Sequence, residues 1–324
     1  MDHGQLMQQP RKLLIILGPT ACGKTGLSIE IAKRFRGEII SGDSMQVYRG
    51  MDIGTAKVLP EEKQGIPHHL LDILDPRDAF SVADFRSLAE SAIRQIEAAG
   101  NLPMVVGGTG LYIDSLLYPY NFAEDMVAQP ELRQRLQTEY LSLGGEELHR
   151  RLAEQDPEAA AKIHPNDEHR LVRALEVLEL TGEPISRRQL DKSRSSPYKA
   201  ILVGLHMERE LLYARIGQRV EQMLEQGLLE EVSRLLREGV PPEANSMQGI
   251  GYRQLVACLQ GECSLEDAVE LIKRDTRRFA KRQITWFKRH PEIAWFDVGH
   301  YREVGDLVDC VSAYVRDRLK EEWI

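Results

Sequence analysis

The chain has 324 residues, of which 42% are hydrophobic and 28% charged, and its formal net charge is −8. This composition is typical of a globular protein with one large or two smaller domains, and the negative charge argues against nonspecific nucleic-acid binding. No run approaches the roughly 18 apolar residues of a membrane span, and the first dozen residues lack the apolar core of a signal peptide, so we expect a cytoplasmic protein.

Residues 18–25, GPTACGKT, match the phosphate-binding pattern G-x-x-x-x-G-K-[ST]. An apolar run at 13–17 precedes them, and Leu27, Ile31 and Phe35 follow at helical spacing, which is the strand–loop–helix context that the pattern requires. Backbone N–H groups would point at an anion, the lysine would add a positive charge, and the threonine hydroxyl would bind Mg²⁺. We therefore predict phosphate binding, with no preference for ATP, by Gly18, Pro19, Thr20, Ala21, Cys22, Gly23, Lys24 and Thr25.

The chain contains four cysteines, Cys22, Cys258, Cys263 and Cys310, without the spacing of a zinc site. They predict reduced thiols and no metal site of their own. Cys22 lies beside Lys24 and before a helix N-terminus, which favours a reactive thiolate. A small thiol buried beneath the loop would instead be inert, and the sequence leaves both alternatives open.

Short apolar runs that end in polar or Gly-rich turns recur along the chain, with helical patterns between them. They predict an α/β fold, a P-loop doubly wound parallel sheet with strands at 13–17, 38–40, 69–74, 104–106, 201–205 and 293–298. Between 119 and 197 the strand signal disappears, which predicts an inserted helical domain. The core domain would comprise residues 1–118 and 198–324 and end in C-terminal helices.

The turn after the second predicted strand carries Asp43 and Ser44, which should emerge at the same sheet edge as the phosphate loop. A carboxylate there could hold Mg²⁺ through water or accept a proton, and the structural alternative is a helix cap. The turn VVGGTGLY follows the strand at 104–106, where many ATPases have an acid, and its absence disfavours ATP hydrolysis. Asp72 in HHLLDIL is an alternative acid.

Residues 273–290, KRDTRRFAKRQITWFKRH, contain eight basic side chains and one acid, Asp275. On a predicted helix, Ile272, Thr276, Phe279, Gln283 and Trp286 share one side, and the opposite side carries Arg274, Arg278, Lys281 and Lys288. Such a stripe is either a solvated helix face or a surface for backbone phosphates.

Six segments in fixed order resemble one family, the bacterial tRNA dimethylallyltransferases, also called tRNA isopentenyltransferases. They are GPTACGKT, GDSMQVYRGMDIGTAK, VVGGTGLY, HPNDEHRLVRALEVLELTG, GIGYRQ and AKRQITWFKR. One departure is Cys22, where many members have serine.

The resemblance implies transfer of a dimethylallyl group from dimethylallyl pyrophosphate to N6 of the adenosine 3′ to the anticodon, in tRNAs that read codons beginning with U. Pyrophosphate would leave, Mg²⁺ would be the cofactor, and the partner would be the tRNA anticodon stem-loop. We expect a monomer. The flipped target base would enter a channel, and the inserted domain would clamp the stem.

The resemblance also assigns residues. Asp43 would be the general base, and Lys24, Thr25 and Arg215 would assist the leaving group. The residues implied for tRNA contact are Asp43, Ser44, Met45, Gln46, Thr109, His169, Arg170, Leu171, Val172, Arg173, Gln248, Gly249, Ile250, Gly251, Tyr252, Arg253, Lys281, Arg282, Gln283, Ile284, Thr285, Trp286, Phe287 and Lys288.

Two rival functions share these features. A P-loop small-molecule kinase would consume ATP, whereas a noncatalytic RNA-binding module controlled by a nucleotide would bind tRNA and transfer nothing.

Overall fold

A computed structural model describes residues 11–118, 130–188 and 196–320. The chain divides into two compact units, one formed by Met1–Leu117 with Ser196–Ile324 and the other by Tyr118–Ser195. No helix in these three described ranges is long and apolar enough to cross a membrane.

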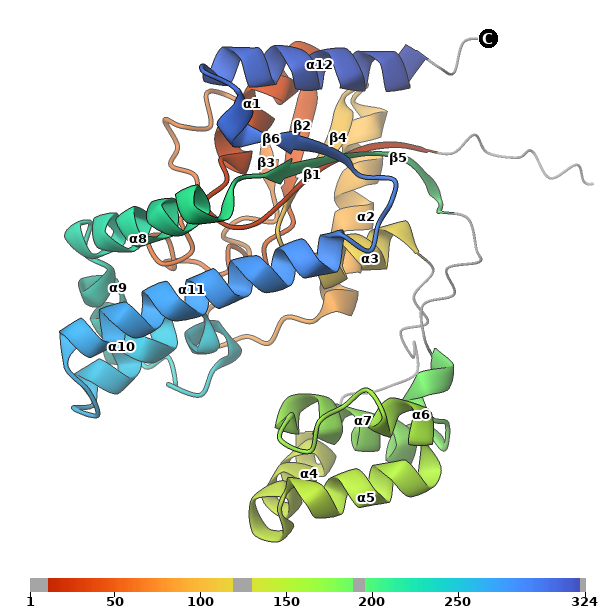
Figure 1. The fold of residues 1–324 in the computed structure, drawn as a ribbon, viewed down its shortest axis with the longest axis vertical. Coiled ribbons are helices and arrows are strands. Elements are labelled where there is room, and N and C mark those ends of the chain that lie inside the picture. Colours follow the sequence, from red (N-terminus) through yellow and green to blue (C-terminus); the bar gives the residue numbers. More distant parts are fainter. Residues whose placement is uncertain (1–10, 119–129, 189–195, 321–324) are drawn as a thin grey trace, which may run out of the picture. The chain divides into compact units, whose positions relative to one another are not determined.

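The larger unit is built on a six-stranded parallel sheet with the order β3-β2-β4-β1-β5-β6 (Figure 1). The strands are β1 (Arg11–Leu17), β2 (Gly37–Ser41), β3 (His68–His69), β4 (Leu102–Gly107), β5 (Tyr198–His206) and β6 (Ala294–Asp297). A doubly wound parallel sheet is therefore confirmed, and every predicted strand is present.

The third strand is much shorter than the predicted 69–74. Leu70 and Asp72 have φ angles of 62° and 56°, in the left-handed region, which ends the extended conformation directly after His69. Asp72 then pairs with the buried Lys57, whose Nζ lies 2.5 Å from its Oδ1.

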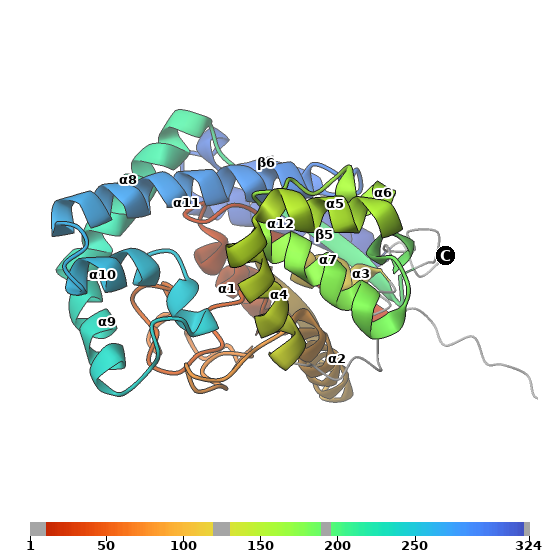
Figure 2. The same cartoon turned by 90° about the horizontal axis from the view of Figure 1, so that it is seen from below.

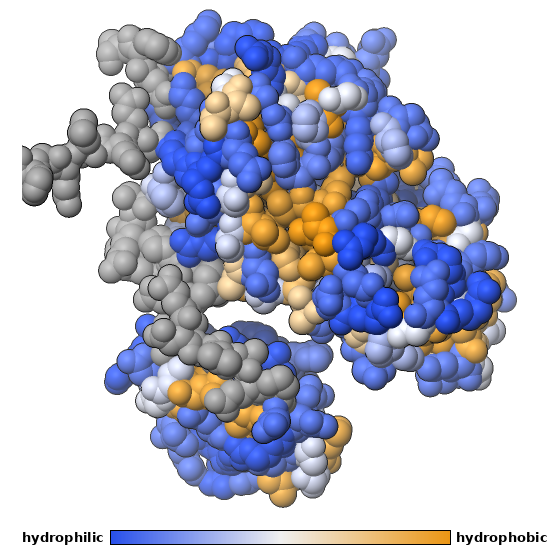
Figure 3. All heavy atoms as spheres, turned by 180° about the vertical axis from the view of Figure 1, so that it is seen from behind, coloured by the Kyte–Doolittle hydropathy of each residue, from blue (hydrophilic) through white to orange (hydrophobic). Residues whose placement is uncertain are grey.

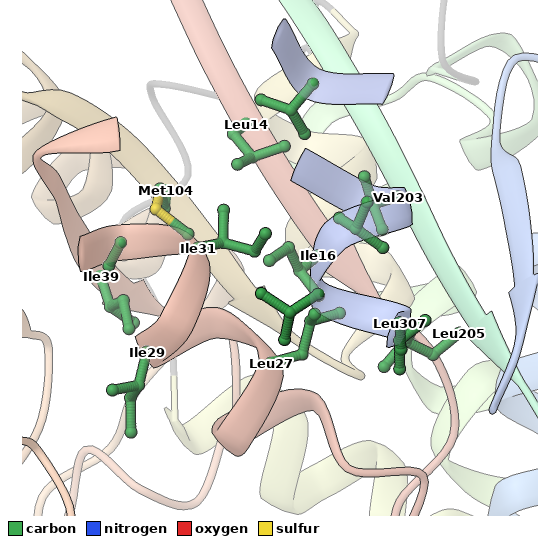
Figure 4. Packing of buried hydrophobic residues seen from close by; sticks show 14 of the residues in the cluster. Leu14, Ile16, Leu27, Ile29, Ile31, Ile39, Met104, Val203, Leu205 and Leu307 are labelled. Atoms are coloured by element: carbon green, nitrogen blue, oxygen red, sulfur yellow. The ribbon is translucent and has the colours of Figure 1, made fainter. Parts of the chain in front are cut away.

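Helices cover the sheet because its strands are apolar on both sides. Leu14 and Ile16 of β1 pack with Leu27 and Ile31 of α1 (Lys24–Phe35) in the cluster shown in Figure 4. That cluster also includes Leu307 of α12 (Val304–Lys320). The alternate β1 residues, at 13, 15 and 17, are equally buried on the other face, as strand geometry requires.

The larger unit contains six further α-helices among the described residues. They are α2 (Val82–Ala98), α3 (Gly110–Leu117), α8 (Arg209–Glu225), α9 (Leu228–Arg237), α10 (Tyr252–Leu259) and α11 (Leu265–Phe287). The views in Figures 1 and 2 show α8, α10 and α11 grouped beyond the sheet edge. From behind, hydrophobic residues gather in the middle of this unit with hydrophilic residues around them (Figure 3).

The smaller unit is helical, as the loss of strand signal predicts. Its elements are α4 (Pro130–Leu143), α5 (Gly145–Gln155), α6 (Pro157–Ala160), α7 (Glu168–Thr181) and the short 3-10 helix η1 (Ile185–Arg188). They enclose a separate core that includes Leu136, Leu148, Leu152 and Leu171.

Candidate active site

Three loops meet at one edge of the sheet. Parallel pairing aligns Leu17 of β1 with Gly107 of β4, and Ser41 of β2 with Val106. Because the carboxyl ends of parallel strands lie at the same edge, the phosphate loop, the Asp43 turn and the GGTG turn leave the sheet together.

The phosphate loop is shaped to leave N–H groups available. Gly18 has a φ of 149°, and a Cβ there would lie 2.6 Å from the carbonyl oxygen of Leu205. The N-cap of α1 is Gly23, which offers no side-chain cap to the first turn of the helix. Lys24 Nζ donates to the carbonyl oxygens of Gly18 (3.0 Å) and Pro19 (2.7 Å), so its charge is held against the loop. These features suit an anion.

The loop opens on a first cavity of about 280 Å³. Of the predicted phosphate-binding residues, those from 20 to 25 line it, whereas Gly18 and Pro19 do not. The other lining residues include Ser41, Asp43, Gln46 and Gly108 at or near the ends of the neighbouring strands, Arg219 of α8, and Phe279 and Gln283 of α11.

A second cavity of about 340 Å³ lies between the Asp43 turn and helices α8, α10 and α11. It brings together many of the residues that the resemblance implies for tRNA contact: Asp43, Ser44, Met45, Thr109, Gln248, Gly249, Ile250, Gly251, Tyr252, Arg253 and Arg282. Gln46 instead lines the first cavity, and its Oε1 accepts a hydrogen bond from Ser41 (2.9 Å).

The two cavities share five lining residues, Thr20, Asp43, Thr55, Arg219 and Phe279. The Met45 N–H donates to Asp43 Oδ1 at 2.9 Å, which fixes the carboxylate at this junction. A group bound to the phosphate loop and a group in the second cavity could therefore both reach Asp43.

The cation at the junction is Arg219. Arg215, which the resemblance implied, is exposed and lines neither cavity, and Arg219 lies one helical turn further along α8. Burial lowers the pKa of Arg219, while the nearby Asp43 and Cys22 act in the opposite direction. An arginine retains its charge under such conditions, so the junction holds one carboxylate and one guanidinium.

Cys22 is buried, with 1% of its surface exposed. Burial raises the pKa of its thiol, and this effect outweighs the opposing influence of Lys24. Of the two alternatives, the structure therefore favours the inert thiol beneath the loop.

Gln283 connects the phosphate loop to the GGTG turn. Its Oε1 accepts a hydrogen bond from the Thr20 N–H (2.9 Å), and its Nε2 donates to the Gly108 carbonyl (3.0 Å). A Cβ at Gly108 would lie only 2.1 Å from that Nε2 and would displace the Gln283 amide. The side chain is buried, and α11 is thereby bonded to both loops.

The comparisons agree on one family. The family model "IPP transferase" matches residues 46–290, and "Isopentenyl transferase" matches residues 11–75. A protein of Carboxydothermus hydrogenoformans named tRNA dimethylallyltransferase is 53% identical, over 89% of this chain and 92% of its own. The chain belongs to the IPP transferase family.

Solved structures of relatives have the same fold. The tRNA isopentenylpyrophosphate transferase of Bacillus halodurans superimposes with a TM-score of 0.73 at 45% identity, covering 96% of this chain and 97% of that one. A eukaryotic dimethylallyltransferase described as acting on tRNA gives a TM-score of 0.74 at 31% identity, over 89% of this chain and 74% of its own.

In this IPP transferase, the buried Glu231 of α9 holds the loop at residues 52–54, a role that the sequence did not predict. Its carboxylate accepts hydrogen bonds from the N–H groups of Asp52 (2.9 Å), Ile53 (2.9 Å) and Gly54 (3.2 Å), and from the Tyr252 hydroxyl (2.6 Å). The loop after Asp43 is thereby bonded to α9, and the same carboxylate bonds α9 to α10. No local pattern in the sequence signals a pairing across about 179 positions.

A second buried link joins α3 to the end of α11. Trp286 Nε1 donates to Asp114 Oδ2 (3.1 Å), and Asp114 Oδ1 lies 3.0 Å from Nε2 of His290. Asp114 and His290 are both buried, and Glu292 lies 3.4 Å from the other ring nitrogen. The hydrogen bond to Asp114 raises the pKa of His290 despite burial.

We expect the free energy of unfolding to fall as the pH rises through the raised pKa of His290. The protonated imidazole is favoured in the folded state, so its contribution is complete below the ordinary histidine pKa of about 6.5 and is lost above the folded value. The stability should therefore decline across the interval between these two pKa values. Urea unfolding between pH 6 and 9 measures it. His290→Gln should remove this dependence, and an unchanged pH profile in that variant would contradict the assignment.

Several residues implied for tRNA contact have buried side chains. In the larger unit these are Gln283, Phe287 and Tyr252, and in the smaller unit they are Leu171 and Val172 of α7. Packing or hydrogen bonds within the protein hold these five side chains, and their contact with RNA stays a prediction. Arg173, nearby on α7, pairs with the buried Glu176 (2.7 Å), and His169 and Arg170 are exposed.

The outer face of α11 carries the basic stripe. Arg274, Arg278, Lys281 and Lys288 are exposed, as predicted for the side opposite Ile272. A shallow hollow on this face is lined by Arg278, Lys281, Arg282, Thr285, Trp286 and Arg289, and the Arg289 guanidinium lies 4.1 Å from the centre of the Trp286 ring.

Proposed function

We propose that the protein transfers a dimethylallyl group from dimethylallyl pyrophosphate to N6 of the adenosine 3′ to the anticodon, in tRNAs that read codons beginning with U. Its relatives are named tRNA dimethylallyltransferases, and a structural relative is described as acting on tRNA. The observation that carries the proposal is the junction of two cavities at Asp43 and Arg219.

The first cavity would hold the donor. Loop N–H groups, Lys24 and Arg219 would surround its pyrophosphate and stabilise the charge that grows as the allylic C–O bond breaks. The second cavity would hold the flipped adenine, so that N6 meets the allylic carbon at the junction.

Asp43 would accept the N6 proton. The N6 lone pair is conjugated with the purine, which makes the amine a weak nucleophile. As the C–N bond forms, one proton must leave the nitrogen, and the fixed carboxylate at the junction can take it. Pyrophosphate leaves with the electron pair of the C–O bond.

The first cavity could bind Mg²⁺ with one or two protein ligands. Thr25 and Asp43 both line it, and the described residues contain no group of three acidic, histidine or cysteine side chains that would form a complete cage. Mg²⁺ commonly uses one or two protein ligands together with water and substrate phosphates. When bound, it would neutralise charge on the pyrophosphate, with Thr25 as its protein ligand.

RNA binding is proposed for the exposed residues of α10 and α11, and for His169, Arg170 and Arg173 of the smaller unit. We also propose that the protein acts as a monomer in the cytoplasm, where its RNA substrate would be found.

Mass spectrometry of an unmodified tRNA tests the proposed function. After incubation with protein, Mg²⁺ and dimethylallyl pyrophosphate, the tRNA should gain one dimethylallyl group at the adenosine 3′ to the anticodon. Release of ADP from ATP, with no change in the tRNA, would favour a kinase. Binding of tRNA without any product would favour a binding module.

Arg219→Ala should lower kcat/KM for the donor by about 10²-fold or more, because removal of a preorganised donor to developing charge typically has that effect. Arg215→Ala is the matched control, since it removes the same charge from an exposed site on the same helix. Steady-state kinetics with varied donor separates the two variants. Equal losses in both would contradict the placement of Arg219.

A further inference from the structure

A groove outside both cavities lies between the start of α8 and the later turns of α11. Its volume is about 520 Å³. The lining residues are His206, Met207, Arg209, Leu212, Tyr213, Lys281, Ile284, Thr285, Lys288 and Trp295. Leu212 and Met207 are buried at its base. The transfer chemistry proposed above gives this groove no role, although its lining residues Lys281 and Lys288 are among the exposed α11 residues for which RNA binding is proposed.

Aromatic side chains form part of the groove, and their positions are constrained. Trp295 of β6 lies against β5, where a Cβ on Gly204 would come within 2.7 Å of its ring. His206 packs edge-on against Trp295 with ring centres 6.1 Å apart. The Arg209 guanidinium lies 5.2 Å from the centre of the Tyr213 ring. Trp295 and Tyr213 are both partly exposed, so each retains ring surface for a ligand.

The rim of the groove is positively charged. Arg209, Lys281 and Lys288 line it and are all exposed. Lys281 and Lys288 are two helical turns apart and therefore share one face of α11. The groove thus combines an apolar base and aromatic rings with cations at its edge, which is the combination that binds single-stranded nucleic acid.

The shallow hollow on the outer face of α11 lies between the groove and the second cavity. Lys281 and Thr285 line both the groove and the shallow hollow, and Arg282 lines both the hollow and the second cavity. Arg282 and Lys288 are about 9 Å apart along the helix axis, at 1.5 Å per residue. Neighbouring nucleotides of one RNA strand can span that length.

We propose that this α8–α11 groove binds an unstacked nucleobase of the substrate RNA, from a nucleotide close to the target adenosine. The base would stack on Tyr213 and Trp295, and its phosphate would lie at Lys281 or Lys288. The proposal rests on the proposed function, because it requires an RNA substrate.

The test compares Tyr213→Ala with Tyr213→Phe, which keeps the ring and removes only the hydroxyl. Binding of an anticodon stem-loop RNA, followed by fluorescence anisotropy, should weaken about 10-fold in Tyr213→Ala and remain unchanged in Tyr213→Phe. Affinity for the donor should be unchanged in both. An RNA with an abasic nucleotide in place of the base that stacks on Tyr213 should bind Tyr213→Ala and Tyr213→Phe with equal affinity.

Tryptophan fluorescence provides a second measurement. The chain has three tryptophans, so Trp295→Phe is compared with the wild-type protein, and the part of the fluorescence change that this variant loses belongs to Trp295. Its emission should be quenched by the stem-loop RNA and unaffected by the donor. This measurement does not depend on whether Tyr213→Ala folds normally.

The outcomes separate the groove from the proposed function. Equal RNA affinity in Tyr213→Ala and Tyr213→Phe, with no quenching of Trp295, would overturn the groove proposal while tRNA modification continued normally. If an added apolar dye quenched the Trp295 fluorescence and the RNA did not, the groove would be a general apolar site, and the proposal would also be overturned. If the wild-type protein neither bound nor modified the RNA, the proposed function would fail as well.

Discussion

Asp43→Asn should lower kcat by about 10²–10⁴-fold, the usual effect of losing a general base. The asparagine Oδ1 can still accept the hydrogen bond from the Met45 N–H, so the turn should keep its shape. The amide cannot take the N6 proton at neutral pH. Single-turnover kinetics with saturating tRNA and donor would measure the loss.

Binding measurements provide the control for this substitution. The dissociation constant for tRNA should change little in Asp43→Asn, because only the proton acceptor has been removed. An unchanged kcat would exclude Asp43 as the base. A loss confined to tRNA affinity would instead make Asp43 a binding residue.

Glu231→Ala should lower the free energy of unfolding by about 3 kcal/mol or more. The change leaves the buried Tyr252 hydroxyl and three partly buried backbone N–H groups without their acceptor, and a fully buried unsatisfied group costs about 1–3 kcal/mol. Glu230→Ala is the matched control, because Glu230 precedes it on the same helix and is exposed. Its effect should stay within about 0.5 kcal/mol.

Urea denaturation of the two variants measures this difference. Glu231→Gln provides a further comparison, since the amide oxygen can accept some of these hydrogen bonds but not all four. Equal stability of the Glu230 and Glu231 variants would show that the loop after Asp43 does not depend on the carboxylate.

The strands of the sheet could be predicted because most of them are short apolar runs that can be recognised in the local sequence. β1 and β4 are continuous apolar runs followed by glycine, and that local pattern is sufficient to place them. β3 was not predictable in length, because the left-handed conformations of Leu70 and Asp72 depend on contacts such as the pairing of Asp72 with Lys57.

The structure places Arg219 at the junction of the two cavities, one turn of α8 beyond the predicted Arg215, and the sequence contains a signal for this position. Leu212, Ile216 and Val220 form the buried stripe of that helix. At 100° per residue, Arg219 lies about 60° from the centre of the stripe and Arg215 about 100°. Helical phase alone therefore favours Arg219 as the partly buried cation.

Because of the hydrogen bonds of Gln283, helix α11 cannot be exchanged without affecting the phosphate loop and the GGTG turn. The helix whose outer surface is proposed to bind RNA is bonded internally to the Thr20 N–H and to the turn that precedes Thr109. A chimera that exchanged α11 for the helix of a distant relative would therefore alter the proposed donor site along with the proposed RNA surface. Specificity for the two substrates must be inherited, or redesigned, as one unit.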